Sequence, residues 1–264
     1  MANPPNKNRP PRLLSVGDVW HLTPNMIRVT LVGPDIHDMA AGCEGAHCKI
    51  FLPSEGQSYQ SFSDQLRDGP RPIVRTYTVR HIRPEHGEMD IDFVDHGDAG
   101  PASAWARKAQ VGDFCGFAGP GSVKLSSFYA DSYLVVADMS ALPVAAATLE
   151  AMPRDATGAA IFEITSQEDK QKIDAPEGIK QHWVINNNPH SGSAEIAEMA
   201  RAMTPPDGVI QTCIAGESSL IKELRNYLTN ERQLPKADAY ISGYWKMGLI
   251  EDEHQQMKRA EAVS

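Results

Sequence analysis

A short segment, RTYTVR at residues 75–80, places a planar cation two residues before an aromatic ring. Because side chains alternate along a strand, Arg75 and Tyr77 share one face. The other face carries Thr76, Thr78 and Arg80. A guanidinium binds anions through charge-assisted hydrogen bonds, and an aromatic ring stacks on a flat heterocycle. The same spacing also occurs in ordinary cross-strand pairs on solvated faces, so the motif needs a second feature beside it.

A second feature follows in the segment HGDAGPASAW at residues 96–105. The pattern predicts the end of a strand, a glycine-bearing turn and a helix that begins at Pro101, where proline suits the first turn. Unpaired N–H groups and the positive end of the helix dipole at such a start bind pyrophosphate. An ordinary strand-to-helix turn, with Ser103 in the first helical turn, is the alternative. The two features together favour a site for a flat nucleotide cofactor.

The elements that must position these residues are mostly strands in the first half of the chain. Alternating or strand-like runs cover residues 27–31, 48–52, 73–80 and 89–93. Residues 53–72 show no apolar period and are expected to form a long loop, and residues 101–109 are expected to form a helix. Short strands at this spacing predict a closed or nearly closed antiparallel barrel.

The second half has a different rhythm, in which apolar strands alternate with helices. The expected strands are 133–137, 160–164, 182–185, 209–215 and 239–242, and the expected helices are 142–152, 194–203 and 218–229. Strands that are apolar throughout predict a parallel sheet covered by helices on both faces. The expected organisation is a disordered arm over residues 1–14, a barrel domain over 15–128, and an α/β domain over 129–264 with a C-terminal helix.

The composition narrows the class of protein. The chain has 264 residues and a formal net charge of −9, which disfavours an overall basic nucleic-acid binder. The longest apolar runs fall short of the roughly 18 residues that a membrane span needs, and the N-terminus lacks a secretory pattern, so a cytoplasmic protein is expected. The four cysteines are too scattered for a disulfide framework. The spacing of Cys43, His47 and Cys48 matches no usual zinc pattern, and no metal site is expected.

Six segments, taken together, resemble the siderophore-interacting proteins. These are flavin-dependent ferric-siderophore reductases of the ferredoxin-reductase-like superfamily. The segments are RTYTVR, DFVDHGDAGPASAWA, VGDFCGFAGP, ADMSALP, AGE and SGYWKMGLIED. The segments follow the family's order and spacing, and the resemblance as a whole runs from about Val19 to Glu253, which is nearly the whole expected fold.

The resemblance implies that the barrel binds FAD. Tyr77 would stack on the isoalloxazine ring, Thr78 would bond near its reactive nitrogen edge, and these two are the expected catalytic residues. Trp105 would either form a wall for the adenine or anchor the helix to the barrel, and the anchoring role is favoured. The implied FAD-binding residues are Arg75, Thr76, Tyr77, Thr78, His96, Gly97, Gly100, Pro101, Ala102 and Ser103, with Arg75 facing the phosphates and the last four at the helix start.

The resemblance implies that the second domain receives NAD(P)H. Its first strand is not followed by a GxGxxG fingerprint; the turn reads DMSALP at residues 138–143. Asp138, Ser140 and Trp245 are the implied cofactor-binding residues, although Ser140 as a helix cap and Trp245 as a core residue are adequate structural explanations. Gly216 and Glu217 are expected at the same sheet edge, where such folds bind ligands.

A net charge of −9 repels the anionic iron chelates that such a reductase handles, so positive charge must be concentrated at one place. Lys49, Lys124 and Lys246 are the expected substrate-binding residues, and Arg80 is a further candidate. Lys49 and Lys246 match positions where the family often has basic residues. The family's Gly-Pro-Arg-Gly segment reads GPGS at residues 119–122, so its arginine is missing here.

The expected activity is therefore transfer of electrons from NAD(P)H through FAD to a ferric siderophore. A flavin converts a two-electron donor into the one-electron steps that iron requires. Oxygen-rich chelators prefer ferric iron, so reduction releases Fe(II). Three alternatives remain open: a flavin reductase or electron-transfer protein for another acceptor, a non-catalytic siderophore-binding protein, and a reductase supplied by ferredoxin. A monomer without nucleic-acid or membrane partners is expected.

Overall fold

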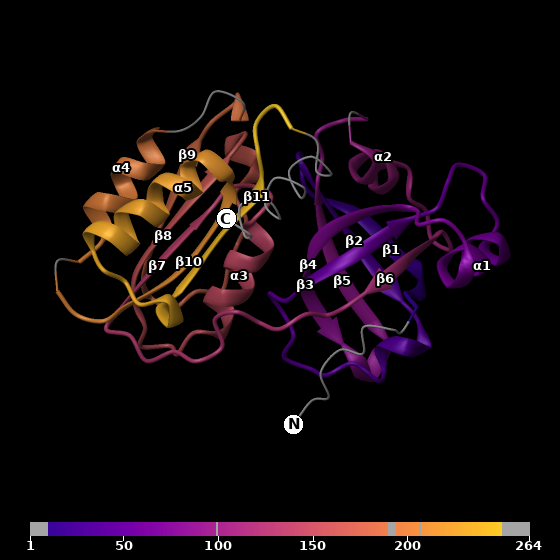
Figure 1. Ribbon diagram of the computed structural model, residues 1–264, viewed down its shortest axis with the longest axis horizontal. Helices are drawn as coiled ribbons and strands as arrows, with labels where there is room; N and C mark the ends of the chain where they lie inside the picture. The colour runs from indigo at the N-terminus through magenta and orange to yellow at the C-terminus, as the bar shows by residue number, and fades with distance from the viewer. Residues whose placement is uncertain (1–9, 99, 190–193, 206, 250–264) are drawn as a thin grey trace. The chain divides into compact units, whose positions relative to one another are not determined.

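The computed structural model describes residues 10–98, 100–189, 194–205 and 207–249 (Figure 1). The chain folds into two compact units, Met1–Lys124 and Leu125–Ser264. The first unit is an all-β barrel with two helices, and the second is an α/β unit. The predicted fold class is therefore confirmed.

The barrel is closed and consists of six antiparallel strands in the order β1-β2-β5-β4-β3-β6. Closure removes the exposed sheet edges that an open antiparallel sheet would leave. The strands are β1 (Arg12–Thr23), β2 (Met26–Val32), β3 (His47–Leu52), β4 (Ile73–Arg83), β5 (Glu88–Val94) and β6 (Phe114–Ala118).

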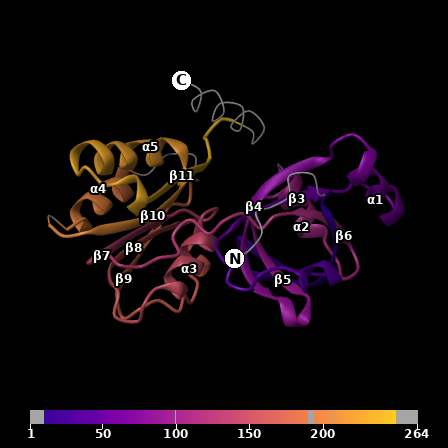
Figure 2. The same cartoon turned by 60° about the horizontal axis from the view of Figure 1, so that its bottom comes forward.

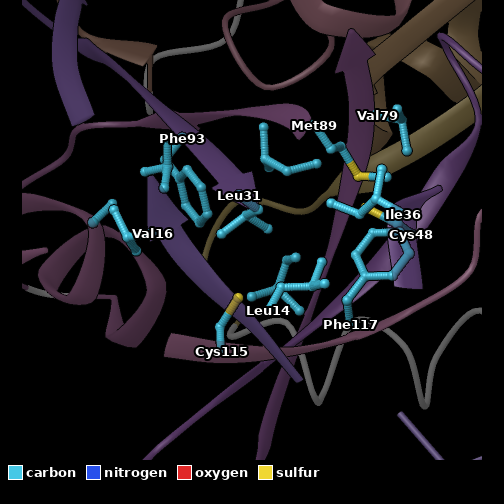
Figure 3. Packing of buried hydrophobic residues seen from close by; sticks show 14 of the residues in the cluster. Leu14, Val16, Leu31, Ile36, Cys48, Val79, Met89, Phe93, Cys115 and Phe117 are labelled. Carbon is cyan, nitrogen blue, oxygen red and sulfur yellow. The ribbon is translucent and has the colours of Figure 1, made fainter. Parts of the chain in front are cut away.

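The interior of the barrel is filled by apolar side chains from almost every strand. Leu14, Leu31, Cys48, Met89 and Phe117 meet there, and none of them is more than 1% exposed (Figure 3). Burial raises the pKa of the Cys48 thiol, so it remains protonated and behaves as a small apolar side chain. The barrel interior is therefore a packed core, and ligands must bind at its outer surface or its ends.

Two predictions for this unit were wrong. The segment expected as a loop contains α1 (Tyr59–Asp68), capped by Ser58, whose side chain accepts a hydrogen bond from the Ser61 N–H at 3.3 Å. Phe62 is fully buried and packs against Phe114, a burial that contributes about 2 kcal/mol. The expected disordered arm also ends earlier, because β1 begins at Arg12 and pairs with β6. Residues 1–9 of the expected arm lie outside the described residues.

The helix α2 (Pro101–Lys108) lies against the barrel and contacts β2, β3 and β5 (Figure 2). Ala102 and Ala106 are buried in the same cluster as the barrel interior. Trp105 packs against Phe93 of β5, with ring centroids 5.7 Å apart. The small alanines let the helix approach the strands closely, and the aromatic contact holds it there.

The second unit has a five-stranded parallel sheet in the order β11-β10-β7-β8-β9. Its helices α4 and α5 lie on one face and α3 on the other (Figure 2). The strands are β7 (Ser132–Ala137), β8 (Thr157–Ile164), β9 (Gly178–Ile185), β10 (Ile210–Glu217) and β11 (Ala239–Trp245). The helices are α3 (Leu142–Ala151), α4 (Ala194–Met203) and α5 (Ser218–Asn226), with a π-helical turn at Tyr227–Glu231 after α5.

The five strands and three helices predicted between residues 133 and 242 are present, with ends moved by a few residues. β7 and β10 are buried on both faces, as a parallel sheet covered by helices requires, although β10 also buries the polar residues Gln211 and Thr212. The expected C-terminal helix lies outside the described residues. No helix within the described ranges is long and apolar enough to cross a membrane.

Candidate functional site

The strand β4 presents Tyr77 and Thr78 on opposite sides of the barrel wall. Val79, the next residue, is fully buried in the core. The Tyr77 ring packs against Phe93, with centroids 4.3 Å apart and planes inclined by 44°. Thr78 is nearly buried, with 4% of its surface exposed. In the β3–β4 register Tyr77 pairs with the core residue Cys48 and Thr78 with His47, so the two side chains alternate as expected, whereas the pairing with β5 is irregular between Val79 and His81.

Arg75 and Thr76 each have a partner from their own unit. An Nη1 hydrogen of Arg75 is donated to the Val74 carbonyl at 2.9 Å. The Lys49 ammonium donates a hydrogen bond to the Thr76 hydroxyl across the β3–β4 pair. These contacts hold a guanidinium and an ammonium on neighbouring positions of two paired strands.

The turn after β5 is held to the start of α2 by Ser103. The Ser103 hydroxyl donates to the Gly97 carbonyl at 2.8 Å and accepts from the His96 N–H at 3.2 Å. Gly97 has φ of 77°, a left-handed conformation that favours glycine, and its N–H donates to Asp95 at 3.0 Å. This serine is 2% exposed, so its hydroxyl acts on the turn itself.

The N-terminus of α2 fits an anionic group. Pro101 occupies the first turn, and no side chain in the described part of the chain caps the helix. Gly100 precedes it, and a Cβ there would lie 2.4 Å from Cε1 of His96, so the imidazole packs directly on this glycine. The first-turn N–H groups of Ala102 and Ser103 and the positive helix end are the donors that a pyrophosphate requires.

An aromatic chain connects the β4 motif to this helix start. Tyr77 contacts Phe93, and Phe93 contacts Trp105 on α2. Phe93 itself lies two residues before the turn that carries His96 and Gly97. The two features that the sequence analysis considered together are therefore one packed structure, and Trp105 anchors α2 as expected.

Positive charge is concentrated beside β4. Lys49 and Lys124 both act on His47, since partial burial lowers the pKa of His47 and the charges of Lys124 and Lys49 lower it further. Lys124 also donates a hydrogen bond to Ser122 at 3.1 Å. Lys246, the third expected substrate residue, follows β11 in the second unit. Arg80 is 5% exposed on β4.

The side chains of Cys48 and His47, two of the three residues considered as metal ligands, point in different directions. Cys48 is in the barrel core, whereas its neighbour His47 lies on the outer face of the strand, where its ring packs against Gly121. Successive residues of a strand point to opposite faces, so a thiolate and an imidazole at these positions do not converge. Burial raises the pKa of Cys43 to about 11, so this thiol is protonated as well.

In the second unit, Asp138 organises the turn at the carboxyl end of β7. Its Oδ1 accepts hydrogen bonds from the Ser140 N–H at 2.9 Å, the Ser140 hydroxyl at 2.6 Å and the Ala141 N–H at 3.2 Å. Its Oδ2 accepts from Nε1 of Trp245 at 2.7 Å. Burial raises the pKa of Asp138, while these four donors oppose that shift. The three expected nucleotide-binding residues are thus brought together, and they bond to one another.

Gly216 and Glu217 lie at the same edge of the sheet. A Cβ at Gly216 would lie 2.5 Å from Oδ2 of Asp138, so only glycine permits this approach of β10. Glu217 caps α5 by accepting from the Ser219 N–H at 2.6 Å. Its other oxygen accepts from the Met247 N–H at 3.2 Å. Gly216 and Glu217 therefore shape this edge of the sheet through contacts with neighbouring parts of the chain.

Sequence reasoning missed two residues of the site. Phe93 was expected only as a strand residue, and its link between Tyr77 and Trp105 required the β4–β5 pairing. His47 was considered only as a metal ligand, and its neighbours became clear from the β3–β4 register, in which it pairs with Thr78. The alternation of apolar and polar residues around Phe93 was a sequence signal that could have identified Phe93. The sequence around His47 contained no such signal.

Comparisons with known families match both units. A family described as "Siderophore-interacting FAD-binding domain" matches residues 15–124, and one described as "Siderophore-interacting protein" matches residues 130–248. The ferric vibriobactin reductase ViuB of Vibrio cholerae is 32% identical over 255 residues, which are 93% of each chain. The ferric acinetobactin reductase of Acinetobacter baumannii is 29% identical over 189 residues, covering 71% of this chain and 66% of the relative.

Solved structures give the same result. The siderophore-interacting protein SipS from Aeromonas hydrophila has a TM-score of 0.84 and 31% identity, covering 97% of this chain and 99% of SipS. A siderophore utilization protein from T. fusca has a TM-score of 0.76 and 34% identity, covering 91% and 94%. The FAD/NAD-binding domain of a Vibrio cholerae nitric oxide dioxygenase shares the fold alone, at 14% identity and a TM-score of 0.64, covering 90% of this chain and 100% of that domain.

Proposed function

The chain belongs to the siderophore-interacting protein family, and we propose that it is an FAD-dependent enzyme that reduces ferric siderophores. The observation that carries the proposal is the match of the family to both units, over residues 15–124 and 130–248. Relatives named ferric vibriobactin reductase and ferric acinetobactin reductase support the reaction class. The basic side chains beside β4 support a negatively charged substrate.

The residues of the barrel fit FAD. The uncapped start of α2 would bind the pyrophosphate through the N–H groups of Ala102 and Ser103, with Arg75 as the cation for the phosphates. Tyr77 would stack on the isoalloxazine ring, and the Thr78 hydroxyl would bond near its reactive edge. When bound, FAD accepts two electrons from a donor and passes them on singly, as ferric iron requires.

The protein's own part is to position these groups before the cofactor binds. Phe93 packs on Tyr77 and so restricts the tyrosine ring. Ser103 bonds both His96 and Gly97, and so holds the turn against the helix. A site whose groups are already ordered loses less entropy on binding, which strengthens affinity.

Lys49, Lys124 and Lys246 are the proposed substrate-binding residues. Lys49 is held on β3 by its bond to Thr76, a proposed FAD-binding residue, so substrate and cofactor sites share this strand pair. A compact ammonium attracts an anionic chelate and donates to its oxygen atoms. Reduction then weakens the hold of hard oxygen ligands on iron and releases Fe(II).

NADH or NADPH is the proposed electron donor, received at the carboxyl edge of the sheet in the second unit. Asp138, Ser140 and Trp245 would act there by shaping the turn, since the oxygens of Asp138 accept four hydrogen bonds from the chain itself. The sheet order and the strand ends support this placement. Four free, buried cysteines are consistent with a reducing cytoplasmic compartment, and we propose a monomer there.

The proposal is tested by two measurements on the purified full chain. The first is the visible spectrum after incubation with FAD and removal of excess; we expect a flavin spectrum, and a colourless protein would refute the proposal. The second is Fe(II) formation from a ferric tris-catecholate, followed with a ferrous trap, with NADH, NADPH or reduced ferredoxin as donor. Flavin reduction without Fe(II) formation would favour a reductase for another acceptor. Chelate binding without a flavin spectrum would favour a non-catalytic binding protein.

A further inference from the structure

The imidazole of His47 occupies the space above Gly121. A Cβ built on Gly121 would lie 2.1 Å from Cε1, 2.6 Å from Nδ1 and 2.7 Å from Nε2 of His47. The Gly121 N–H also donates to the His47 carbonyl at 2.8 Å, which joins the loop to the start of β3. The loop therefore carries no side chain at the position where the similar family segment has arginine, and a histidine ring lies in its place.

His47 points to the same side of the barrel wall as Lys49, Thr76 and Thr78, and to the opposite side from Tyr77, which pairs with the core residue Cys48. In the β3–β4 register, His47 pairs with Thr78 and Lys49 pairs with Thr76. Side chains of directly paired antiparallel residues lie on one face of the sheet. Cys48, between His47 and Lys49, points into the core. His47 and Lys49 therefore flank the face that carries Thr76 and Thr78.

The charged groups around His47 are mainly positive. Lys49 lies on its own strand, and Lys124 lies on the segment after β6; the charges of both lower the pKa of His47, in addition to its partial burial. From β1, Arg12 donates a hydrogen bond to the Gly119 carbonyl at 2.9 Å in the loop against His47. From β4, the partners on this face are the uncharged Thr76 and Thr78, with Arg80 next along the strand. Glu44, before β3, acts on the Cys43 thiol.

An anion bound beside His47 would reverse the effect of the neighbouring charges on the protonation of its imidazole. With two ammonium groups nearby and no anion, the neutral imidazole is favoured at neutral pH. A chelate oxygen carrying negative charge favours the imidazolium, whose N–H groups both donate. By linkage, the site then takes up a proton as the anion binds, and the new charge–charge hydrogen bond adds to affinity.

We propose that His47 is a substrate-binding residue that takes up a proton when an anionic ferric chelate binds beside Lys49 and Lys124. This inference rests on the proposed function. It adds His47 to the substrate-binding residues and implies that the site prefers negatively charged ferric chelates. A trianionic tris-catecholate complex would favour protonation of His47 and interact with the imidazolium, whereas an uncharged tris-hydroxamate complex would not. His47 thereby provides a positive charge only when an anionic ligand is present.

The test is isothermal titration calorimetry of the FAD-loaded full chain with gallium(III) tris-catecholate, which binds as the ferric complex does but is not reduced. Titrations at neutral pH in two buffers of different ionisation enthalpy give the number of protons taken up. We expect the wild type to take up a proton and His47→Gln to take up none, with affinity reduced by about tenfold, the equivalent of one pKa unit. His47→Lys, with a permanent charge, should bind tightly without proton uptake.

The matched control is His86→Gln, because His86 is an exposed histidine of the same unit on the turn between β4 and β5. It should keep the wild-type affinity and proton uptake. Proton uptake that persists in His47→Gln, or chelate binding by the wild type without proton uptake, would overturn the inference and leave the reductase function intact. A wild type that binds FAD but no chelate would overturn the inference and the proposed substrate together.

Discussion

The replacement Ser103→Ala tests whether the turn after β5 is what holds FAD. The Ser103 hydroxyl makes two hydrogen bonds to the turn, at 2.8 Å to the Gly97 carbonyl and 3.2 Å from the His96 N–H. Each such bond contributes about 0.5–1.5 kcal/mol net, so the turn loses about 1–3 kcal/mol of local stability. Because a free-energy change of about 1.4 kcal/mol is tenfold in affinity, we expect the Kd for FAD to rise by about tenfold.

The assay is titration of apoprotein with FAD, followed by quenching of flavin fluorescence, together with urea unfolding of each variant. The matched control is Ser58→Ala, which removes the N-cap of α1 and costs about 1 kcal/mol of stability at a site without proposed cofactor contacts. The control should lose stability and keep its affinity for FAD. Equal FAD affinity in Ser103→Ala and the wild type would refute the reasoning that the ordered turn and helix start hold the cofactor.

Three further predictions concern charge and the second unit. Lys49→Ala should raise the KM for a ferric tris-catecholate by about tenfold or more at nearly constant kcat, because a charge-assisted contact is lost. Burial raises the pKa of Asp90, but hydrogen bonds from Arg83 and other donors outweigh burial and hold that pKa well below its ordinary value. A depressed pKa stabilises the fold above the unfolded value of about 4, so wild-type unfolding free energy should fall as the pH drops below it, and Asp90→Asn should flatten this decline. Asp138→Asn should destabilise the second unit by about 1–3 kcal/mol, because its amide would face the Trp245 N–H donor, as measured by tryptophan fluorescence in urea.

Each of these has its own control and contrary result. For the lysine, Lys180→Ala changes an exposed lysine of β9 and should leave KM unchanged; an equal rise in KM for an uncharged ferric tris-hydroxamate would count against a charge effect. For the acid dependence, Asp174→Asn removes an exposed carboxylate and should leave the decline of unfolding free energy with falling pH unchanged. The same decline in Asp90→Asn as in the wild type would contradict the prediction. For the last variant, wild-type stability of the second unit would contradict the hydrogen-bond argument.

The sequence predicted most of the fold because the two halves have different apolar periods. Strands of the second unit such as Tyr133–Ala137 are apolar throughout, and a parallel sheet buried on both faces leaves little freedom in their assignment. The helix α1 was missed because few of its residues are apolar, and its only fully buried side chain is Phe62. Long-range packing decides that helix, and a single sequence does not display it.

The candidate site was predictable to the extent that its residues are close in sequence. The segments around Tyr77 and Ser103 were recognised from local patterns, and the structure brings them together through Phe93. The place of His47 depended on the strand register and on a loop far along the chain that ends in contact with it. The roles of Asp138 and Trp245 also required the fold, because a direct bond joins a turn after β7 to the end of β11.

The central claim is that electrons pass from the flavin in this chain to iron held by a chelator. It is tested most directly by reducing the FAD-loaded protein without oxygen and mixing it with a ferric tris-catecholate in a stopped-flow instrument. We expect the absorbance of oxidised flavin to return at the same rate as Fe(II) appears in the trap. Each reduced flavin should yield two Fe(II) ions, because it carries two electrons and each ferric ion accepts one. Reduced flavin that stays reduced in the presence of saturating ferric chelate would contradict it.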